Sequence, residues 1–600
     1  MKKKQRSDFL RDIGGCPAAM WHGWMRQAVK ADFRDGPGSV YASDYTGPTI
    51  LIMYGGGETN LCNLHHRKLA EEAAGHLWKT HHKMAAVEPV AAVTDAISMG
   101  HAYEDEPRLG AMGYSLFSRE MFASSIVQQV EINCADAVII ITGCDKTVAG
   151  GLLAASWLKD LPVVVVHGGT IRAGCSLSGR SIEIETANEV AGMLAAGKVD
   201  QAEHDDILIR SLPSPGGCGI MATSNTLACI GSALGISIFS SASTPAMDTD
   251  HVSVFPKKLE EAREAGDCLV KMMEEGRTVG DCVDERSFRN ATVMLHAVGG
   301  STNAVIHLPA IAEGFGIPFG LENIRETSDT PVLLNLLPAG MYVMVDLFEK
   351  ADGIAPLAKY MVEQGLLDGE AQTITGSSVA DGLSDTPLPE FVNPQIDVIR
   401  SLEAPLKPKS SLCVVTGDHS TEEKSSIATL GSVFKLNANV RQFDGTARVF
   451  DHEGKAVEAV LSGKIVLGDV IVLRYQGVTV GCPELLRLTA ALSGMGTDSE
   501  IAVVTDGRLS GVSRGTLVVH VEPEAWSGGP IALIEEGDRI TLDGDAESLF
   551  VHIPADEMKQ RADAWQKPSI ELPRGPMRIA AQVVRPLAEG AIWWPHGSNG

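Results

Sequence analysis

The sequence of 600 residues lacks any apolar run long enough to cross a lipid bilayer. The aliphatic stretch at residues 161–166 falls far short of the roughly 20 residues that a membrane-spanning helix needs. The basic start at residues 1–4 is not followed by the apolar core of a signal peptide. We therefore expect no membrane partner and a cytoplasmic protein.

An excess of basic residues is also missing, because the formal net charge is −26. Nucleic acids and anionic membrane surfaces both need basic protein surface, so we expect neither as a partner. Acidity does not predict an anionic ligand either. Any such ligand would have to be held by local cations or by metal ions.

The cysteines lack the dense spacing of a secreted disulfide framework. There are eleven of them, an odd number, and they are scattered along the chain, which is typical of a reducing compartment. Closely spaced Cys-x-x-Cys pairs and a His-x-x-x-His helix are missing too, so a structural zinc site has no obvious ligand set. We find no internal repeat and no low-complexity segment.

The length exceeds what one hydrophobic core usually supports, so two or more domains are expected. From about residue 370 to 410 the composition shifts toward Ser, Asp and Pro, which is typical of a linker. We place the boundary there and predict one domain at residues 1–385 and a second at residues 386–600.

The first half alternates short aliphatic strands with helices, the pattern of an α/β domain with a parallel sheet. Such sheets bind ligands beyond the carboxyl ends of their strands. The predicted strands are residues 49–53, 84–93, 137–141 and 161–166, and the predicted helices are residues 64–78, 118–134 and 147–158.

The second half favours short β-strands, which predicts a β-rich domain. The predicted strands are residues 412–416, 470–475, 501–505, 517–521 and 531–534, with a hairpin formed by residues 539–542 and 549–552.

Three cysteines lie in turns that suit metal ligands, namely Cys62, Cys144 and Cys218. Thiolates at strand ends and helix starts are electrostatically favoured and accessible to a soft metal. Taken singly, each is more often a small buried hydrophobic residue. Zinc is a rival metal, but three thiolates suit an iron–sulfur cluster with one iron left open.

Carboxylates accompany these thiols at Asp95, Asp145 and Glu484, and carboxylates are ligands for hard cations. Asp145 and Lys146 directly follow Cys144, which is also compatible with an ordinary solvated turn. If a metal binds here, Lys146 must be neutralised, buried with partners or covalently modified, because an ammonium repels a cation.

Two glycine-rich segments complete the candidate site. Ser510 lies in the turn at residues 506–511 and would be exposed there as a nucleophile or base, although a plain β-turn is the simpler reading. Ser301, Thr302 and Asn303 follow two glycines; they could present hydroxyl groups and amides to an anion or merely cap a helix.

Taken together, these segments resemble the dihydroxy-acid and sugar-acid dehydratase family. The ordered set is specific where one motif would be weak. It runs through residues 62–65, 94–101, 115–120, 143–146, 217–219, 299–303, 482–484, 505–511 and 528–530.

The resemblance implies an N-terminal α/β domain and a C-terminal barrel-like β domain. It implies an Fe–S cluster on Cys62, Cys144 and Cys218, for which we favour [2Fe–2S] over [4Fe–4S]. It also implies Mg²⁺ and a catalytic base at Ser510. The magnesium ligands would be Asp95, Asp145, Glu484 and a carbamylated Lys146, and the substrate contacts would be Ser301, Thr302, Asn303 and Arg508.

The expected reaction is dehydration of a 2,3-dihydroxy carboxylate, a small anionic hydroxy acid, to a 2-keto acid. We favour sugar acids as substrates, with the branched dihydroxy acid of valine and isoleucine synthesis as the alternative. From other classes, a non-catalytic Fe–S redox protein and a zinc-dependent hydrolase stay open. A homodimer or homotetramer is expected, and Trp593 and Trp594 would pack either on a neighbouring subunit or within their own chain.

Overall fold

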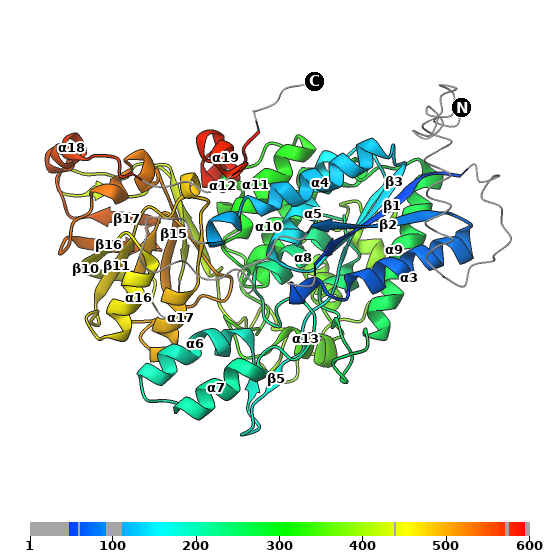
Figure 1. The fold of residues 1–600 in the computed structure, drawn as a ribbon, viewed down its shortest axis with the longest axis horizontal. Coiled ribbons are helices and arrows are strands. Elements are labelled where there is room, and N and C mark those ends of the chain that lie inside the picture. The colour runs from blue at the N-terminus through cyan, green and yellow to red at the C-terminus, as the bar shows by residue number, and fades with distance from the viewer. Residues whose placement is uncertain (1–46, 58–59, 92–110, 437–439, 570–574, 595–600) are drawn as a thin grey trace.

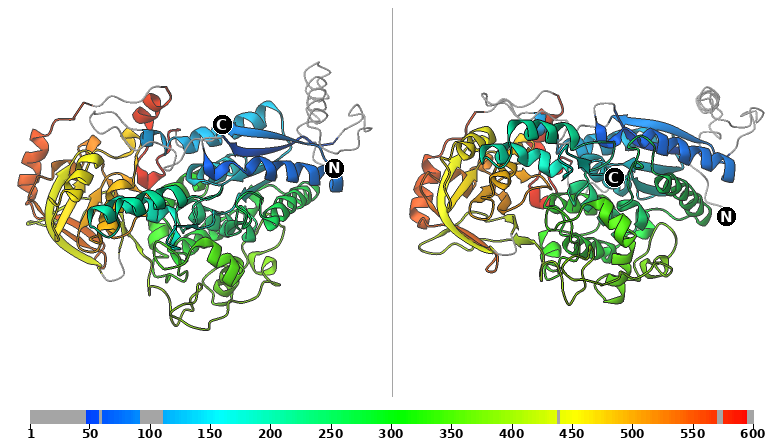
Figure 2. Two further views of the ribbon diagram at one scale, coloured as in Figure 1. Left: turned by 60° about the horizontal axis from the view of Figure 1, so that its bottom comes forward. Right: turned by 90° about the horizontal axis from the view of Figure 1, so that it is seen from below.

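The computed structural model describes residues 47–57, 60–91, 111–436, 440–569 and 575–594. It contains an N-terminal α/β domain and a C-terminal domain built on one large curled sheet. The two domains lie at opposite ends of the molecule, with the helical segment around α13 (Met344–Ala351) below the first sheet (Figures 1 and 2).

The N-terminal domain contains a four-stranded sheet in the order β2-β1-β3-β4. Its strands are β1 (Ile50–Gly56), β2 (Ala85–Ala91), β3 (Ala137–Thr142) and β4 (Val163–His167), and every neighbouring pair is parallel. The central strands are apolar because helices cover both faces. Pro89 lies in the edge strand β2, where a missing backbone donor is tolerated. The predicted parallel sheet is confirmed.

Helices pack on this sheet, and three of them match the predicted ranges within a few residues. The helices nearest the sheet and the site are α3 (His66–His81), α4 (Ser118–Ile132), α5 (Asp145–Trp157), α8 (Thr223–Ala233), α9 (Pro256–Glu275), α10 (Glu285–Ala297) and α11 (Ala304–Phe315). Further out are the hairpin β5 (Gly174–Cys175) and β6 (Ser181–Ile182), and helices α6 (Ile184–Ala195), α7 (Gln201–Arg210), α12 (Leu321–Arg325), α14 (Ala355–Glu363) and α15 (Val379–Gly382).

The C-terminal domain is a nine-stranded sheet that curls into a half-barrel, in the order β7-β9-β15-β13-β11-β10-β16-β17-β8. Its middle strands are parallel and its outer strands antiparallel. The strands are β7 (Leu412–Val415), β8 (Ser425–Ser426), β9 (Gly431–Lys435), β10 (Gln442–Phe450), β11 (Asp469–Leu473), β13 (Ala502–Thr505), β15 (Thr516–Glu522), β16 (Arg539–Asp543) and β17 (Ser548–Val551). The helices are α16 (Glu453–Leu461), α17 (Arg487–Met495) and α18 (Ala555–Ala564).

One predicted strand is wrong. Residues 531–534 belong to the 3₁₀ helix η8 (Pro530–Leu533) and the residue after it. Pro530 at the first position of this helix fixes a helical φ and removes a donor that a ladder would need. The predicted hairpin is confirmed, because β16 and β17 pair antiparallel.

The chain returns to the N-terminal domain after the second sheet. The 3₁₀ turn η9 (Leu587–Glu589) packs on α11. Helix α19 (Met577–Val583) lies near the start of α4, where Ala580 packs with Phe117. Arg119 Nη2 donates to the carbonyl of Gly590 over 2.8 Å. The ring of Trp594 packs edge-on against Trp157, 4.9 Å between centroids, so this half-buried segment packs on its own chain.

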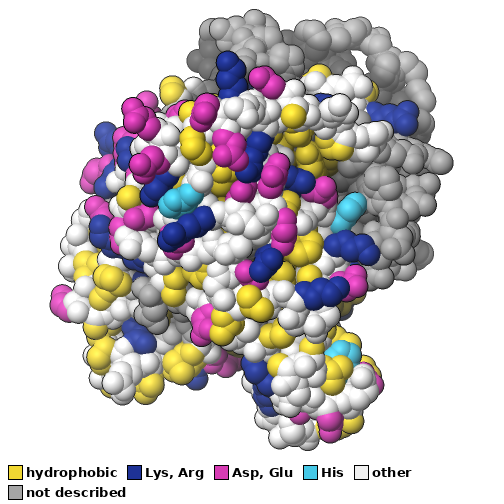
Figure 3. Space-filling model, turned by 90° about the vertical axis from the view of Figure 1, so that its left-hand side faces the viewer, with side chains coloured by type: hydrophobic (Ala, Val, Ile, Leu, Met, Phe, Trp, Pro, Cys, Tyr) yellow, Lys and Arg dark blue, Asp and Glu magenta, His cyan; other side chains and the backbone are white. Residues whose placement is uncertain are grey.

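No helix in the described ranges combines the length and the apolar character that crossing a bilayer requires. At the end of the molecule formed by the C-terminal domain, acidic and basic side chains lie intermingled with scattered apolar ones (Figure 3).

Candidate active site

The cysteine-bearing loops lie at the carboxyl ends of the parallel strands. Cys62 lies in the 3₁₀ turn η2 (Leu61–Asn63) after β1, and Cys144 directly precedes α5 after β3. The amide Nδ2 atoms of Asn60 and Asn63, on either side of Cys62, lie 3.4 and 3.7 Å from Cys144 Sγ. The first two loops therefore meet, as the strand order predicts.

The loop of Cys218 joins them from further along the chain. A Cβ atom added to the preceding residue, Gly217, would lie only 2.6 Å from the carbonyl oxygen of Gly143. Glycine at 217 thus permits a close approach between this loop and that of Cys144. Asn225 Nδ2 holds the loop by donating to the carbonyl of Cys218 over 2.5 Å.

The surroundings of Cys144 favour a negatively charged sulfur. Cys144 is the N-cap of α5, where backbone N–H groups and the helix dipole stabilise anions. Thr147 Oγ1 lies 3.3 Å from the sulfur, in addition to the two asparagine amides. The thiol is buried, at 1% exposure, so these protein dipoles take the place of water.

The proposed hard-cation residues meet across the two domains. Lys146 Nζ, on α5, lies 3.9 Å from Asp145 Oδ2 and 3.9 Å from Glu484 Oε2. These are ion-pair distances, longer than a hydrogen bond. Glu484 belongs to the short strand β12 (Glu484–Leu485) of the C-terminal domain. Asp95 lies outside the described residues.

Glu484 is buried and oriented by Arg508. The strand β14 (Arg508–Leu509) pairs in parallel with β12, with Arg508 opposite Glu484. Arg508 Nη1 donates to Glu484 Oε2 over 2.9 Å, Nε to the carbonyl of Cys482 over 2.7 Å, and Nη2 to Ser115 Oγ over 2.7 Å. In the described part of the chain, Glu484 Oε1 has no hydrogen-bond partner. A buried, oriented carboxylate oxygen of this kind suits a cation.

Ser510 follows β14 in a tight turn that packs on the start of α8. A Cβ atom added to Gly511 would lie 2.6 Å from the backbone nitrogen of Thr223, the first residue of α8. Lys435 Nζ donates to the carbonyl of Gly511 over 3.3 Å, and burial lowers the pKa of this lysine to about 7. The prediction that Ser510 is exposed in its turn is wrong, because the turn packs on α8 and leaves the serine 7% exposed, which limits access of bulk water.

The serine–asparagine segment before α11 reaches the same place. Thr223 Oγ1 lies 3.0 Å from Ser301 Oγ and accepts a hydrogen bond from Asn303 Nδ2 over 3.0 Å. Thr302 between them is also buried. The hydroxyl and amide groups of this segment thus meet the turn of Ser510 through the start of α8.

Sequence reasoning missed two buried histidines beside this site and gave Arg119, in the segment 115–120, no role. Arg119 Nη1 lies 3.1 Å from His307 Nδ1. Burial, with Arg119, Lys146 and Arg508 adding positive charge, holds the pKa of His307 well below its usual range. Burial and Arg508 lower the pKa of His520 to about 3, so both rings are neutral. The spacing of His307 four residues after Asn303, on one face of α11, is the signal that could have found it.

These elements define a two-domain α/β enzyme whose buried site combines thiols, carboxylates and a lysine. Sequence profiles of the dihydroxy-acid/6-phosphogluconate dehydratase N-terminal and C-terminal domains match residues 47–382 and 397–591. The chain therefore belongs to this dehydratase family and is a hydro-lyase.

Several relatives match nearly the whole chain. A dihydroxy-acid dehydratase of Methylococcus capsulatus is 37% identical over 554 residues, covering 92% of this chain and 93% of the relative. One of Pyrobaculum aerophilum is 36% identical over 566 residues, covering 92% and 94%. One of Francisella tularensis subsp. novicida is 35% identical over 540 residues, covering 89% and 91%.

Proposed function

We propose that the chain dehydrates 2,3-dihydroxy carboxylates to 2-keto acids, with the branched dihydroxy acid of valine and isoleucine synthesis as its substrate. The observation that carries the proposal is the convergence of Asp145 and Lys146 with Glu484, from separate domains, directly beside Cys144. The names of the three relatives support the branched substrate better than the sugar acids we favoured from the sequence.

The segment of Tyr475 and Gln476 is bonded to the turn that carries Ser510. The backbone N–H groups of Tyr475 and Gln476 donate to the Asp506 carboxylate over 3.2 and 2.9 Å. The Tyr475 hydroxyl accepts from Trp565 Nε1 over 3.0 Å. These contacts give the segment a structural role at the base of the turn that carries Ser510.

The donor sets fit the two inorganic groups that the family resemblance implies. Cys144 has a thiolate-stabilising environment, and Glu484 presents an oxygen without a hydrogen-bond partner among the described residues. An Fe–S cluster held by Cys62, Cys144 and Cys218 would supply Lewis acidity toward the C3 hydroxyl. Mg²⁺ held by Asp145, Glu484, carbamylated Lys146 and Asp95 would neutralise the negative charge of the substrate carboxylate.

The protein's own groups then have defined tasks. Ser510 Oγ, in its deprotonated form, takes the proton from C2. The proton that Ser510 accepted passes to the departing C3 hydroxyl group, which leaves as water, and the enol left behind tautomerises to the 2-keto acid. One water is lost and no electrons are exchanged. Arg508 fixes the Glu484 carboxylate, and Ser301 and Asn303 offer hydrogen bonds near the serine turn.

The test is keto-acid release by protein purified and assayed without oxygen, using branched dihydroxy acids and aldonates in parallel. We expect turnover of the branched acids. We expect Ser510→Ala to lower turnover by about 10²–10⁴-fold with unchanged iron content, since positioned proton transfer contributes that much. Ser513→Ala is the matched control, because its hydroxyl bonds Thr489 Oγ1 over 2.7 Å, inside the protein.

Turnover of aldonates alone would replace the branched substrate with the sugar acids. A reversible one-electron couple without keto acid from any substrate would refute the proposed reaction and favour the redox protein. Full activity of Ser510→Ala would remove the serine from its role as base.

A further inference from the structure

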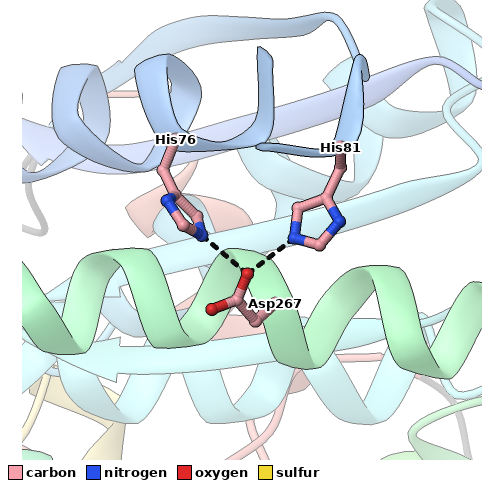
Figure 4. A group of neighbouring side chains, drawn as sticks. All are labelled: His76, His81 and Asp267. Atoms are coloured by element: carbon pink, nitrogen blue, oxygen red, sulfur yellow. Dashed lines mark hydrogen bonds and ion pairs between the residues drawn. The ribbon is translucent and has the colours of Figure 1, made fainter. Parts of the chain in front are cut away.

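Two histidines and an aspartate converge on one point of the surface, away from the proposed active site (Figure 4). His76 Nε2 and His81 Nε2, both from α3, each lie 2.6 Å from the same oxygen of Asp267 on α9. The three ligand atoms lie within 4.8 Å of one another. His76 lies ten residues after His66, the first residue of α3, which is about 15 Å along the helix axis. The cluster is therefore remote from the loop of Cys62 at the start of this helix.

The packing of α3 on α9 sets up this arrangement. Leu77, next to His76, is buried between the helices, and a Cβ atom added to Gly266 would lie 3.3 Å from its Cγ and 3.6 Å from His76 Cδ2. Gly266 therefore lets the helices approach closely directly beside Asp267. His82, with φ of 53°, ends α3 in a left-handed cap immediately after His81.

The ligand chemistry is that of a zinc-class cation. Two imidazole nitrogens and one carboxylate oxygen form the three-ligand set of open zinc sites, with a fourth position left for water. The side chains of His76 and His81 are 17% and 24% exposed and that of Asp267 is 51% exposed, so an ion can enter from solvent.

We propose that His76, His81 and Asp267 bind one Zn²⁺ or a similar divalent transition-metal ion, which fastens the C-terminal end of α3 to α9. Ligand atoms around tetrahedral zinc lie about 3.3 Å apart, from metal–ligand distances of about 2.0–2.1 Å. The Asp267 oxygen must therefore move outward from its present contacts when the ion enters, and its half-exposed side chain has room to do so. The bound ion links α9 to the helix that begins four residues after Cys62.

The experiment measures zinc in untagged holoenzyme after exposure to Zn²⁺ and dialysis into zinc-free buffer, with iron measured in the same samples. The test variants are His76→Asn and His81→Asn. His82→Asn is the matched control, because it alters a histidine at the same helix end, outside the cluster, and asparagine tolerates the left-handed conformation. Any zinc bound at the active site should be the same in all samples, so it does not affect the difference in zinc content between wild type and variants.

We expect wild type and His82→Asn to hold one equivalent of zinc more than either test variant, at equal iron content. Zn²⁺ should also raise the thermal midpoint of the first two proteins only, as binding to the folded state requires. Equal zinc content in all four proteins, or an equal zinc-induced shift, would overturn the proposal and leave the cluster as a hydrogen-bonded link between the helices.

Discussion

Arg508 Nη1 lies 2.9 Å from Glu484 Oε2, and both side chains are almost fully buried. The same guanidinium binds Ser115 of the N-terminal domain and the carbonyl of Cys482. One planar cation thus fixes a proposed metal ligand and connects the two domains at the site.

Replacing Arg508 with lysine should destabilise the protein and abolish turnover. An ammonium cannot reproduce the planar guanidinium's three separate contacts. A buried polar group that is left without its hydrogen-bond partner costs about 1–3 kcal/mol. Chemical denaturation and keto-acid release measure both effects. Arg539→Lys is the control, since the Arg539–Asp444 pair is exposed and such pairs contribute at most about 1 kcal/mol. Unchanged stability of Arg508→Lys would contradict the positioning role.

Cys144→Ser should lose the visible absorbance and bound iron of the proposed Fe–S cluster while keeping its fold. The serine oxygen can still cap α5, but it is a poor ligand for iron–sulfur clusters. Cys413→Ser is a suitable control, because Cys413 is buried in the C-terminal sheet. A full complement of iron in Cys144→Ser would remove this cysteine from the ligand set.

Lys146→Arg should fold normally but lose magnesium-dependent turnover. Arginine keeps a positive charge between Asp145 and Glu484 but cannot form the carbamate we propose. Protein equilibrated with ¹³C-labelled bicarbonate should show a carbamate carbon signal in wild type and none in the variant. Wild-type turnover by Lys146→Arg would contradict carbamylation.

The free energy of unfolding should fall as the pH rises, because the buried Glu183 carboxyl then loses its proton. Burial, with repulsion from Glu185 and Asp346, raises its pKa from the ordinary 4.5 to about 8. Between these values the folded state holds a proton that the unfolded state releases, so the stabilisation is complete below pH 4.5 and is lost on approach to pH 8. At about 1.4 kcal/mol per pH unit, the loss amounts to roughly 3–5 kcal/mol.

Glu183→Gln should flatten that decline, as measured by the free energy of unfolding at pH 5, 6, 7 and 8. Glu260→Gln, on the exposed face of α9, should leave the decline as it is in wild type. Parallel pH profiles of wild type and Glu183→Gln would show that this carboxyl carries no proton in the folded state.

Much of the fold follows from local pattern, and much of the site does not. The strands before Cys62 and Cys144 begin with short runs of apolar residues, so their positions and the shared edge of the sheet could be predicted. The run at residues 531–534 is equally apolar, yet Pro530 begins a 3₁₀ helix there. A short apolar run is too brief to show the periodicity that distinguishes a β-strand from a helix.

The contacts of the site join residues far apart in the chain, which no local pattern records. The bond of Arg508 to Ser115 spans 393 positions, and the approach of Gly511 to Thr223 depends on how the two domains dock. The motif residues could be recognised, but the serine turn resting on α8, and His307 beside Arg119, depend on tertiary packing. Asp95 lies outside the described residues, so its role stays a prediction.

Lys146 and Glu484 come from different halves of the polypeptide, so Lys146 is synthesised well before Glu484, its ion-pair partner. Loading of the proposed magnesium centre must then wait until the second half has emerged, folded and docked. A nascent or truncated chain would contain the three proposed cysteine ligands but lack Glu484. The proposed reaction could therefore begin only after Glu484 has been synthesised.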